Sequence, residues 1–498
     1  MRMRAMGLAG AAALLCAAGP DKVDMAARIL PAPATPGEAV KPFVKVDHRS
    51  VAILHVRVID GTGAAPLEDR TVLIAAGRIA AVGGAEVPLP HDVQAINGTG
   101  MTLMPGIVGM HDHQYYIARP NLDAAGHSEP PLMVPQMAFS SPRLYLAGGV
   151  TTLRTTGSVE PYTDLNMKAA IDRGELPGPH MDVTGPYLEG SGSPFLQMHP
   201  LKDAEDARRT VDFWADQGVT SFKAYMNITR AQLKAAIDAA HVRGIKVTGH
   251  LCSVTYPEAA ALGIDNLEHG FWVNTSLDPG KQPDVCPESD GGPTLKAMTP
   301  GSDAAKELIA ILVAHKVAVT STLPVFETSS PNYRTLPPQQ LALMSPEARA
   351  DYFYVRTLQM NASPVRKAER AALWANELAM ERAFVDAGGL LIAGPDPTGA
   401  GNVLPGFGDQ RAIILLVEAG FTPLEAIRIG TLNGATYLGL DARIGSIAPG
   451  KDADLVLVRG DPSKQIGDIA NVVTVFKDGV GYDPAALLAS VSGRYGQY

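Results

Sequence analysis

The sequence contains no cluster of basic residues and has an excess of acidic ones. Its 498 residues include 42 Lys and Arg against 51 Asp and Glu, which gives a formal net charge of -9 at pH 7. Proteins that bind nucleic acid usually present a basic patch to the phosphates. The composition therefore argues against nucleic acid as a partner.

Long hydrophobic runs are also scarce. The one candidate is N-terminal, where Arg2 and Arg4 precede an alanine-rich segment that ends in small residues, as a signal peptide does. We expect a signal peptide over residues 1–19, a linker over residues 20–46, and export to the periplasm or the medium. A short membrane anchor and a lipid attached to Cys16 are the alternatives. We expect no other segment to span a membrane.

Cysteine is rare, with three residues in the whole chain. Removal of a signal peptide would leave Cys252 and Cys286. The two remaining thiols of an exported protein often pair, and two unrelated buried thiols are the alternative.

Short apolar runs recur along the middle of the chain, and most are followed by a segment with helical character. The eight runs are MPGIVGMHDH, GVTTLRTTG, HMDVTGPYL, VTSFKAY, IKVTGH, NLEHGF, VAVTSTL and GLLIAGPD. Strand followed by helix, repeated eight times, is typical of an α/β protein with a (β/α)8 TIM barrel. A doubly wound sheet has the same alternation, so the count of eight favours the barrel.

Glycine-broken β segments precede and follow this region, and we expect them to pair. The prediction is a composite β-sandwich domain formed by both ends of the chain, over residues 47–104 and 440–485. The barrel would occupy residues 105–439. Two long connections within it, 272–305 and 324–383, would cover the active face, as long strand-to-helix insertions usually do.

Side chains of metal-ligand type stand at the ends of the apolar runs. They are His111, His113, Lys223, His250, His269 and Asp396. Each has an ordinary explanation when taken alone, as a core histidine, a turn aspartate or a lysine that reaches solvent. Because barrel chemistry lies at the carboxyl ends of the strands, all six would meet at one mouth. Together they predict a metal site.

These motifs resemble those of the amidohydrolase superfamily, in particular its prolidase and Xaa-dipeptidase-like branch. The resemblance covers roughly residues 50–485 and rests on HDH, FKAY, VTGH, NLEHG, GPD and the tail AIRIGTLNGATYLGLDARIGSIAPGKDADLVLV. It implies two divalent metal ions, with Zn2+ the first choice, and N6-carboxylated Lys223 as their bridging ligand. By the same resemblance, His111, His113 and Asp396 would bind one ion, and His250 and His269 the other.

The resemblance also implies a reaction. A metal-activated hydroxide would attack a carbonyl carbon, with Asp396 as the catalytic acid and base. We therefore expect hydrolysis of an amide or peptide-type C–N bond in a small molecule of the dipeptide or N-acyl amino acid class. Because relatives tend to form homo-oligomers, we expect the same of this enzyme. A mononuclear deaminase, an imidazolonepropionase-like cyclic amide hydrolase and an exported binding protein on a degenerate barrel are the alternatives.

Several residues bear on the shape of the pocket. Tyr115 and Tyr225 are candidates for contacting the substrate, and Arg119, Arg154 and Arg356 for binding a substrate carboxylate.

Two positions depart from the family pattern. Gly109 stands in a stretch where relatives carry an acidic residue, and Cys252 stands where several carry a substrate-binding tyrosine. On a barrel, Cys252 and Cys286 would lie on the same face, so we expect a disulfide that holds the 272–305 loop over the site.

Overall fold

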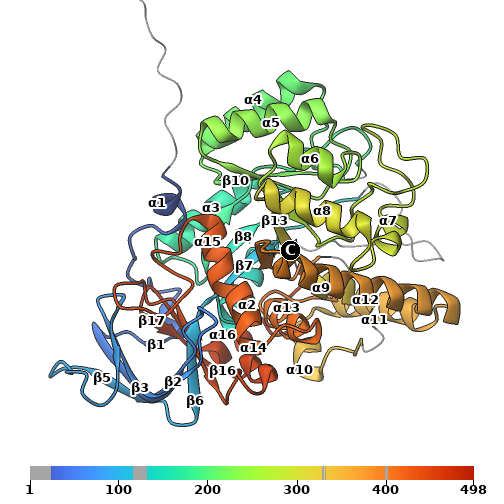
Figure 1. The fold of residues 1–498 in the computed structure, drawn as a ribbon. Coiled ribbons are helices and arrows are strands. Elements are labelled where there is room, and N and C mark those ends of the chain that lie inside the picture. Colours follow the sequence, from blue (N-terminus) through green and yellow to red (C-terminus); the bar gives the residue numbers. More distant parts are fainter. Residues whose placement is uncertain are drawn as a thin grey trace, which may run out of the picture.

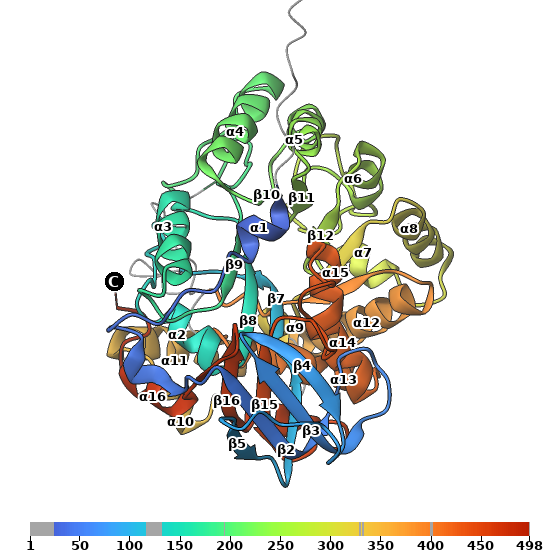
Figure 2. The same cartoon turned by 90° about the vertical axis from the view of Figure 1, so that its left-hand side faces the viewer.

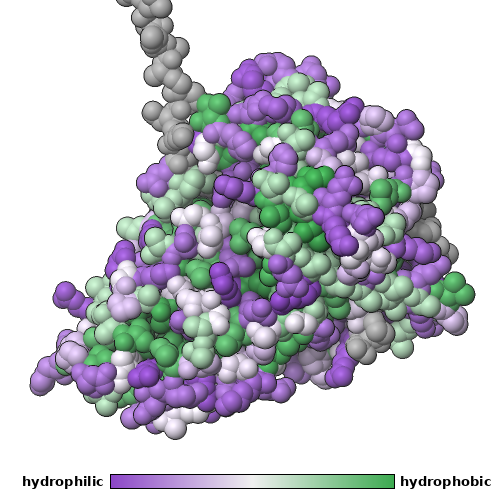
Figure 3. Space-filling view, in the orientation of Figure 1, coloured by the Kyte–Doolittle hydropathy of each residue, from purple (hydrophilic) through white to green (hydrophobic). Residues whose placement is uncertain are grey.

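The computed structural model describes residues 24–115, 132–193, 195–327, 330, 333–398 and 402–497. The expected signal peptide and the first residues of the expected linker lie outside these ranges. None of the helices in the described ranges combines the length and the hydropathy needed to cross a membrane. Hydrophilic side chains cover much of the face shown in Figure 3, including the region of the two uppermost helices.

Eight parallel strands form the centre of the molecule, and each of the eight apolar runs contains one of them. They are β7 (Ile107–Asp112), β8 (Val150–Thr155), β9 (His180–Val183), β10 (Ser221–Ala224), β11 (Lys246–Gly249), β12 (Asn266–Glu268), β13 (Ala318–Ser321) and β14 (Leu391–Ala393). They are hydrogen-bonded in chain order as two sheets, β7-β8-β9 and β10 to β14. All of their residues except Lys246 are buried, which explains why the runs are largely apolar.

Bridges and hydrogen bonds connect the two parallel sheets on both sides. After β9, parallel bridges join Thr184 to Ser221 and Leu188 to Ala224. After β14, the Asp396 N–H donates to the carbonyl oxygen of His111 in β7 at 2.9 Å. The fold is therefore mixed α/β, and this arrangement is consistent with an eight-stranded barrel.

Helices lie outside the parallel strands (Figure 1). Their bounds are α1 (Met25–Ile29), α2 (Ser141–Ala147), α3 (Pro161–Asp172), α4 (Ala204–Gln217), α5 (Arg230–Val242), α6 (Tyr256–Leu262), α7 (Gly292–Ala297), α8 (Asp303–Ala314), α9 (Leu323–Phe326), α10 (Pro338–Leu341), α11 (Pro346–Met360), α12 (Pro364–Asp386), α13 (Phe407–Glu418), α14 (Pro423–Arg428), α15 (Gly434–Leu438) and α16 (Pro484–Ser490).

Local sequence sets where these helices begin and end. At α6, the Thr255 side chain accepts from the Glu258 N–H, and the Glu258 carboxylate accepts from the Thr255 N–H. This reciprocal cap satisfies two donors that the first helical turn leaves unpaired. The helix stops at Gly263, whose φ of 95° lies in the left-handed region that favours glycine.

Two long connections follow β12 and β13 at the carboxyl ends of these strands. Residues 272–305 are mostly loop and contain α7 and the start of α8. Residues 324–383 contain α10, α11 and most of α12, and α12 runs on to Asp386. The helical character predicted for the second insertion is therefore present.

Strands from both ends of the chain share one nine-stranded sheet. They are β1 (Val44–Val46), β2 (Ser50–Val58), β3 (Leu67–Ala75), β4 (Arg78–Gly83), β5 (Gln94–Asn97), β6 (Met101–Pro105), β15 (Leu455–Arg459), β16 (Val472–Lys477) and β17 (Val480–Tyr482). β6 pairs with β15, and β1 pairs with β17. Figure 2 shows the blue N-terminal strands beside the red C-terminal ones.

The described part of the expected linker, from residue 24 to 46, packs against the rest of the chain. Ile29 and Leu30 are 0% and 2% exposed and join a cluster with Val108 and Met110 of β7. Val44 to Val46 form β1 of the nine-stranded sheet. The structure differs here from a free linker because these apolar residues find buried partners.

Gly394 gives a test of the close contact between β14 and β7. A Cβ at this position would collide with the backbone of His111. We expect Gly394→Ala to lower the free energy of unfolding by about 1–3 kcal/mol, the usual cost of overpacking. Gly292→Ala is the control, since a Cβ there meets nothing within 4 Å. Equal unfolding midpoints for both variants in urea would show that the contact does not constrain the fold.

Candidate metal centre

The side chains predicted as metal ligands come together at the carboxyl ends of five parallel strands. They are His111 and His113 at and after the end of β7, Lys223 in β10, His250 after β11, His269 after β12 and Asp396 after β14. Five are buried and His250 is partly exposed. With the exception of His111, all line one cavity of about 230 Å3.

Asp396 lies at the centre of three histidines. Its Oδ1 is 3.1 Å from His113 Nε2 and 3.7 Å from His111 Nε2, and its Oδ2 is 3.8 Å from His269 Nδ1. One ligand atom from each of His111, His113 and Asp396 can be chosen so that all lie within 4.8 Å of one another. A carboxylate and two imidazoles at this spacing suit a divalent ion such as Zn2+.

His250 and His269 form a second pair beside the first group. Their ring centroids are 4.3 Å apart. The Nε2 atoms of both rings are buried, and neither has a hydrogen-bond partner in the described part of the chain. Because buried polar atoms are normally paired, two unpaired imidazole nitrogens in one place fit a site that receives a ligand from outside the chain.

The backbone at two of these residues is unusual. His269 has a φ of 69° and Asp396 a φ of 52°, both in the left-handed region. Residues other than glycine adopt this conformation rarely, and it costs on the order of 1–3 kcal/mol where a bulky side chain does so. Such strain is concentrated at functional sites, which agrees with the position of both residues.

Burial keeps the histidines neutral. It lowers the pKa of His113 to about 4 and, with the nearby charge of Lys223, that of His250 to about 3. Burial by itself would raise the pKa of Asp396, but His111, His113 and His269 together lower it well below the usual value. Neutral imidazoles and an ionised carboxylate are the forms that bind metals.

Lys223 is almost fully buried, with 1% of its surface exposed. Its Nζ lies 3.3 Å from His111 Nε2, and no carboxylate of the described residues forms an ion pair with it. Burial lowers the pKa of the amine to about 8. Burial therefore makes the uncharged amine more accessible than in an exposed lysine, although the charged form still prevails at pH 7.

Glu268 and Arg154 form a buried ion pair beneath the histidines. The Arg154 Nη2 donates to Glu268 Oε1 at 2.7 Å, and both side chains are fully buried. The other carboxylate oxygen of Glu268 lies 2.7 Å from His111 Nδ1. Burial alone would raise the pKa of Glu268, but Arg154 and His111 lower it to about 2.

Glu268 was not among the predicted site residues, although it precedes the predicted ligand His269 in NLEHG. Arg154 was a candidate for binding a substrate carboxylate, and the structure contradicts that interpretation. It also donates to the carbonyl oxygen of Met110 and to Asn266, and it has no exposed surface. Arg356 instead lies beside Tyr333, with 4.2 Å between its guanidinium and that ring, and Arg119 is outside the described residues.

Two buried carboxyl groups stand next to Gly109. A Cβ on Gly109 would collide with Asp112 and Asp409. The space beside β7 is therefore filled by these two carboxyl groups, and a side chain at position 109 has no room. Burial raises the pKa of both, that of Asp409 to about 7.

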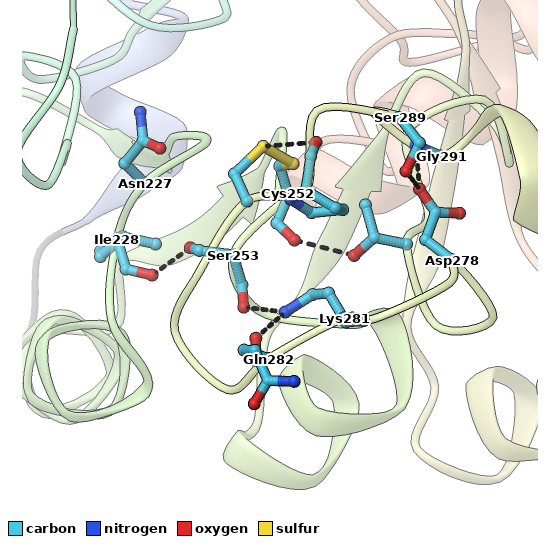
Figure 4. Close-up of a disulfide and its surroundings, with 12 residues drawn as sticks. Asn227, Ile228, Cys252, Ser253, Asp278, Lys281, Gln282, Ser289 and Gly291 are labelled. Carbon is cyan, nitrogen blue, oxygen red and sulfur yellow. Dashed lines mark hydrogen bonds between the residues drawn. A yellow bond between two sulfur atoms is a disulfide. The ribbon is translucent and has the colours of Figure 1, made fainter.

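The expected disulfide between Cys252 and Cys286 is present (Figure 4). It joins the segment after β11 to the loop after β12, with 4.8 Å between the two Cα atoms. Hydrogen bonds support the same loop, since Thr275 donates to the Cys252 carbonyl oxygen at 2.8 Å and Lys281 to that of Ser253 at 2.7 Å. The loop is therefore fixed at the carboxyl end of the strands.

The buried ion pair predicts the effect of Glu268→Gln. The change removes one charge and leaves Arg154 buried without compensation, so the free energy of unfolding should fall by about 3–5 kcal/mol. Glu68→Gln is the matched control, because Glu68 pairs with Arg57 at 2.8 Å but is 63% exposed. Chemical denaturation of both variants measures the difference. Equal and small losses of stability in both variants would mean that the buried ion pair stabilises the fold no more than the exposed pair does.

The disulfide predicts a loss of stability on reduction. It closes a sequence separation of 34 residues, and its removal should lower the free energy of unfolding by about 2–4 kcal/mol. Denaturation with and without a thiol reductant measures this change. A Cys252→Ala, Cys286→Ala double variant is the control and should not respond to reductant. An unaltered wild-type curve with both thiols free would contradict the role given to the cross-link.

Comparison with known sequences finds a family profile that matches part of the chain. The sequence profile of the amidohydrolase family matches residues 356–481. The adenine deaminase of Ruegeria sp. (strain TM1040) is 47% identical over 48 residues, which is 10% of this chain and 8% of that protein. Adenine deaminase 1 of Jannaschia sp. (strain CCS1) is 43% identical over 50 residues, with the same coverage of 10% and 8%. The match thus spans less than a tenth of the length of these relatives.

Solved structures share the fold over most of the chain. A bottromycin amidohydrolase has a TM-score of 0.66 and 20% identity, over 93% of this chain and 96% of that one. A Xaa-Pro dipeptidase with bound methionine has a TM-score of 0.63 and 18% identity, over 87% and 100%. The A. niger ochratoxinase has a TM-score of 0.61 and 17% identity, over 88% and 96%. Residues 356–481 thus match the amidohydrolase family, and over most of the chain the fold is that of the solved amidohydrolase and Xaa-Pro dipeptidase structures.

Proposed function

We propose that the protein is an exported, binuclear metal-dependent amidohydrolase that cleaves an amide or peptide-type C–N bond. The observation that carries this proposal is the meeting of four histidines, Lys223 and Asp396 in one buried site. Two imidazole nitrogens in that site have no partner in the described part of the chain. The superfamily match and the fold shared with peptidases support the proposal.

The residues divide into two groups that would hold two divalent ions. His111, His113 and Asp396 would hold one ion, and His250 and His269 the other. Lys223 would bridge them after carboxylation, in which the neutral amine adds to CO2, forms an N–C bond and releases one proton. Nitrogen and oxygen ligands of this kind suit Zn2+. When bound, the ions would polarise the scissile carbonyl and acidify a water molecule.

Asp396 would move the proton during hydrolysis. Its carboxylate is ionised, central among the histidines and partly open to the cavity, with 8% of the residue exposed. It can accept a proton from the attacking water and pass it to the leaving nitrogen. The strained backbone at Asp396 would keep the carboxylate in that position.

Glu268 would set the orientation of His111. An ionised carboxylate can only accept hydrogen bonds, so His111 Nδ1 must be the donor in the 2.7 Å contact. The proton of His111 is therefore on Nδ1, and Nε2 has a free lone pair that faces Asp396 and Lys223. Thr322 Oγ1 lies 2.9 Å from His269 Nδ1 and can hold that ring in place, either as donor or as acceptor.

The larger organisation of the chain is part of the proposal. The eight parallel strands would close into one (β/α)8 barrel within residues 105–439, supported by the hydrogen bond from Asp396 to His111. Residues 47–104 and 440–485 would form the accompanying domain. Export is supported by the disulfide, because such bonds persist in oxidising compartments.

A mononuclear deaminase is the second candidate function. It is favoured by the short matches to adenine deaminases. Those matches cover about a tenth of the chain. A mononuclear site needs no bridging ligand, whereas Lys223 lies inside the site at the position of such a ligand. The metal stoichiometry separates the two functions.

The proposal predicts the metal content of a Lys223→Ala variant. The wild-type protein should contain about two equivalents of divalent metal, and the variant about one or less, because the bridging ligand is lost. Elemental mass spectrometry of the purified proteins measures the content. Lys246→Ala is the control, since Lys246 begins β11 and its amine lies over the Tyr437 ring at 4.2 Å, away from the site. A metal content of one equivalent in the wild type, unchanged in Lys223→Ala, would contradict a binuclear site.

A further inference from the structure

A second group of potential metal ligands lies at the other end of the parallel strands. His180 is the first residue of β9, Asp454 directly precedes β15, and Asp478 stands in the turn between β16 and β17. One ligand atom from each of these three residues, here called the basal cluster, can be chosen so that all lie within 4.8 Å of one another. The basal cluster is separate from the candidate metal centre, whose cavity is lined by Tyr115 and Tyr225 at the carboxyl ends of the strands.

The basal cluster connects two parts of the fold. β9 belongs to the parallel strands, whereas β15, β16 and β17 belong to the nine-stranded sheet. Figure 2 shows β8 and β9 above β15 and β16. The Gly106 N–H donates to the carbonyl oxygen of Asp454 at 2.9 Å, and the Asp478 N–H donates to Asp454 Oδ1 at 2.8 Å. These bonds hold Asp454 between the end of β6 and the turn that carries Asp478.

The spacing of the three side chains is that of ligands around one ion. His180 Nε2 lies 3.3 Å from Asp478 Oδ1 and 3.7 Å from Asp454 Oδ2. A charge-assisted hydrogen bond between such groups is shorter, at about 2.7–2.9 Å. Two ligand atoms at about 2.0–2.2 Å from a tetrahedral zinc ion are roughly 3.3–3.6 Å apart. The observed separations are therefore long for direct ion pairs and close to those of neighbouring zinc ligands.

The charges of the basal cluster need a further partner. Asp454 and Asp478 bring two negative charges when both are ionised, and Lys477 Nζ, 3.4 Å from Asp478 Oδ2, compensates one of them. Asp454 Oδ2 is buried and has no hydrogen-bond partner in the described part of the chain. Because an uncompensated buried carboxylate is costly, either a proton or a bound cation must balance the second charge. The spacing favours a cation, since a shared proton would draw the atoms to hydrogen-bond distance.

A small cavity adjoins the basal cluster. It is lined by His180, Asp478 and Lys477, and by residues of the N-terminal segment such as Pro31 and Pro36. Its volume of about 20 Å3 is enough for one water molecule, which needs about 10–15 Å3. A substrate does not fit in such a space. An ion at this position would therefore have a structural role and not a catalytic one.

We propose that the basal cluster binds a structural divalent cation with the coordination chemistry of Zn2+. Its ligands are the His180 imidazole and one oxygen from each of Asp454 and Asp478, and a water molecule in the adjoining cavity completes a tetrahedral set. The ion joins β9 to the nine-stranded sheet. This inference does not rest on the proposed function, because none of the three residues takes part in the proposed reaction.

Asp454→Asn tests the site, because it removes one charge and one ligand but keeps an oxygen for the Asp478 N–H. The purified protein is stripped with a chelator, reloaded with Zn2+ and freed of unbound metal by gel filtration. By elemental mass spectrometry the variant should hold about one equivalent of Zn2+ less than the wild type. Asp182→Asn is the matched control, since Asp182 is a buried residue of β9 that accepts from Thr220 and lies outside the basal cluster. It should hold as much Zn2+ as the wild type.

Asp478→Asn is a second variant, which decides the matter if Asp454→Asn does not fold. Asp478 has a φ of 54° and precedes Gly479, and Asn is as favourable as Asp at this position of a hairpin turn. Urea unfolding with and without Zn2+ measures the structural role. A ligand stabilises the state that binds it, so Zn2+ should raise the midpoint of either variant less than that of Asp182→Asn.

Anomalous scattering from a crystal of the Zn2+-loaded wild type locates the ion directly. A peak between His180, Asp454 and Asp478 supports the inference. The absence of that peak, or an equal Zn2+ content in the wild type and both variants, overturns it and leaves a proton as the balancing charge. An equal loss of Zn2+ in Asp182→Asn overturns it as well. The proposed function is judged separately by Lys223→Ala, whose expected loss of metal occurs at the other end of the strands.

Discussion

The buried pair of Arg154 and Glu268 is the interaction on which the site depends. Arg154 reaches across from β8 to Glu268 at the end of β12, and the second oxygen of Glu268 meets His111 of β7. Three parallel strands are therefore tied together by a chain of charged hydrogen bonds without access to water. Such bonds are about twice as strong as neutral ones, and they orient as well as stabilise. The position of His111 follows from them.

Much of the fold and of the ligand set could be predicted because both depend on simple patterns. Parallel strands covered on both faces appear as continuous apolar runs, so each of β7 to β14 was visible in the sequence. The ends of such strands meet at one edge, which is why His111, His250 and His269 could be expected together. The pairing of Cys252 with Cys286 followed from the same reasoning about which face each occupies.

The remaining features depend on contacts that no local pattern reveals. Arg154 lies in an apolar run and could equally have reached a substrate, and only the neighbouring strand shows that it binds Glu268. Tyr187 follows β9 like many core tyrosines, and only the structure shows that its hydroxyl oxygen lies 2.6 Å from that of Tyr115. Residues 20–46 were expected to be a linker because they are rich in Pro and Ala, yet Ile29 and Leu30 pack in one cluster with Val108 and Met110 of β7.

The shared nine-stranded sheet has a consequence for how the chain is made. Thr102 at the start of β6 donates to the carbonyl oxygen of Gly460, a partner 358 positions later. At about 5–20 residues per second, a ribosome needs roughly 20–70 s to produce the residues between them. During that interval the edge of β6 that will receive β15 has no strand to pair with. An unpaired edge can pair with other chains, so this side of β6 is protected only once β15 has emerged and paired with it.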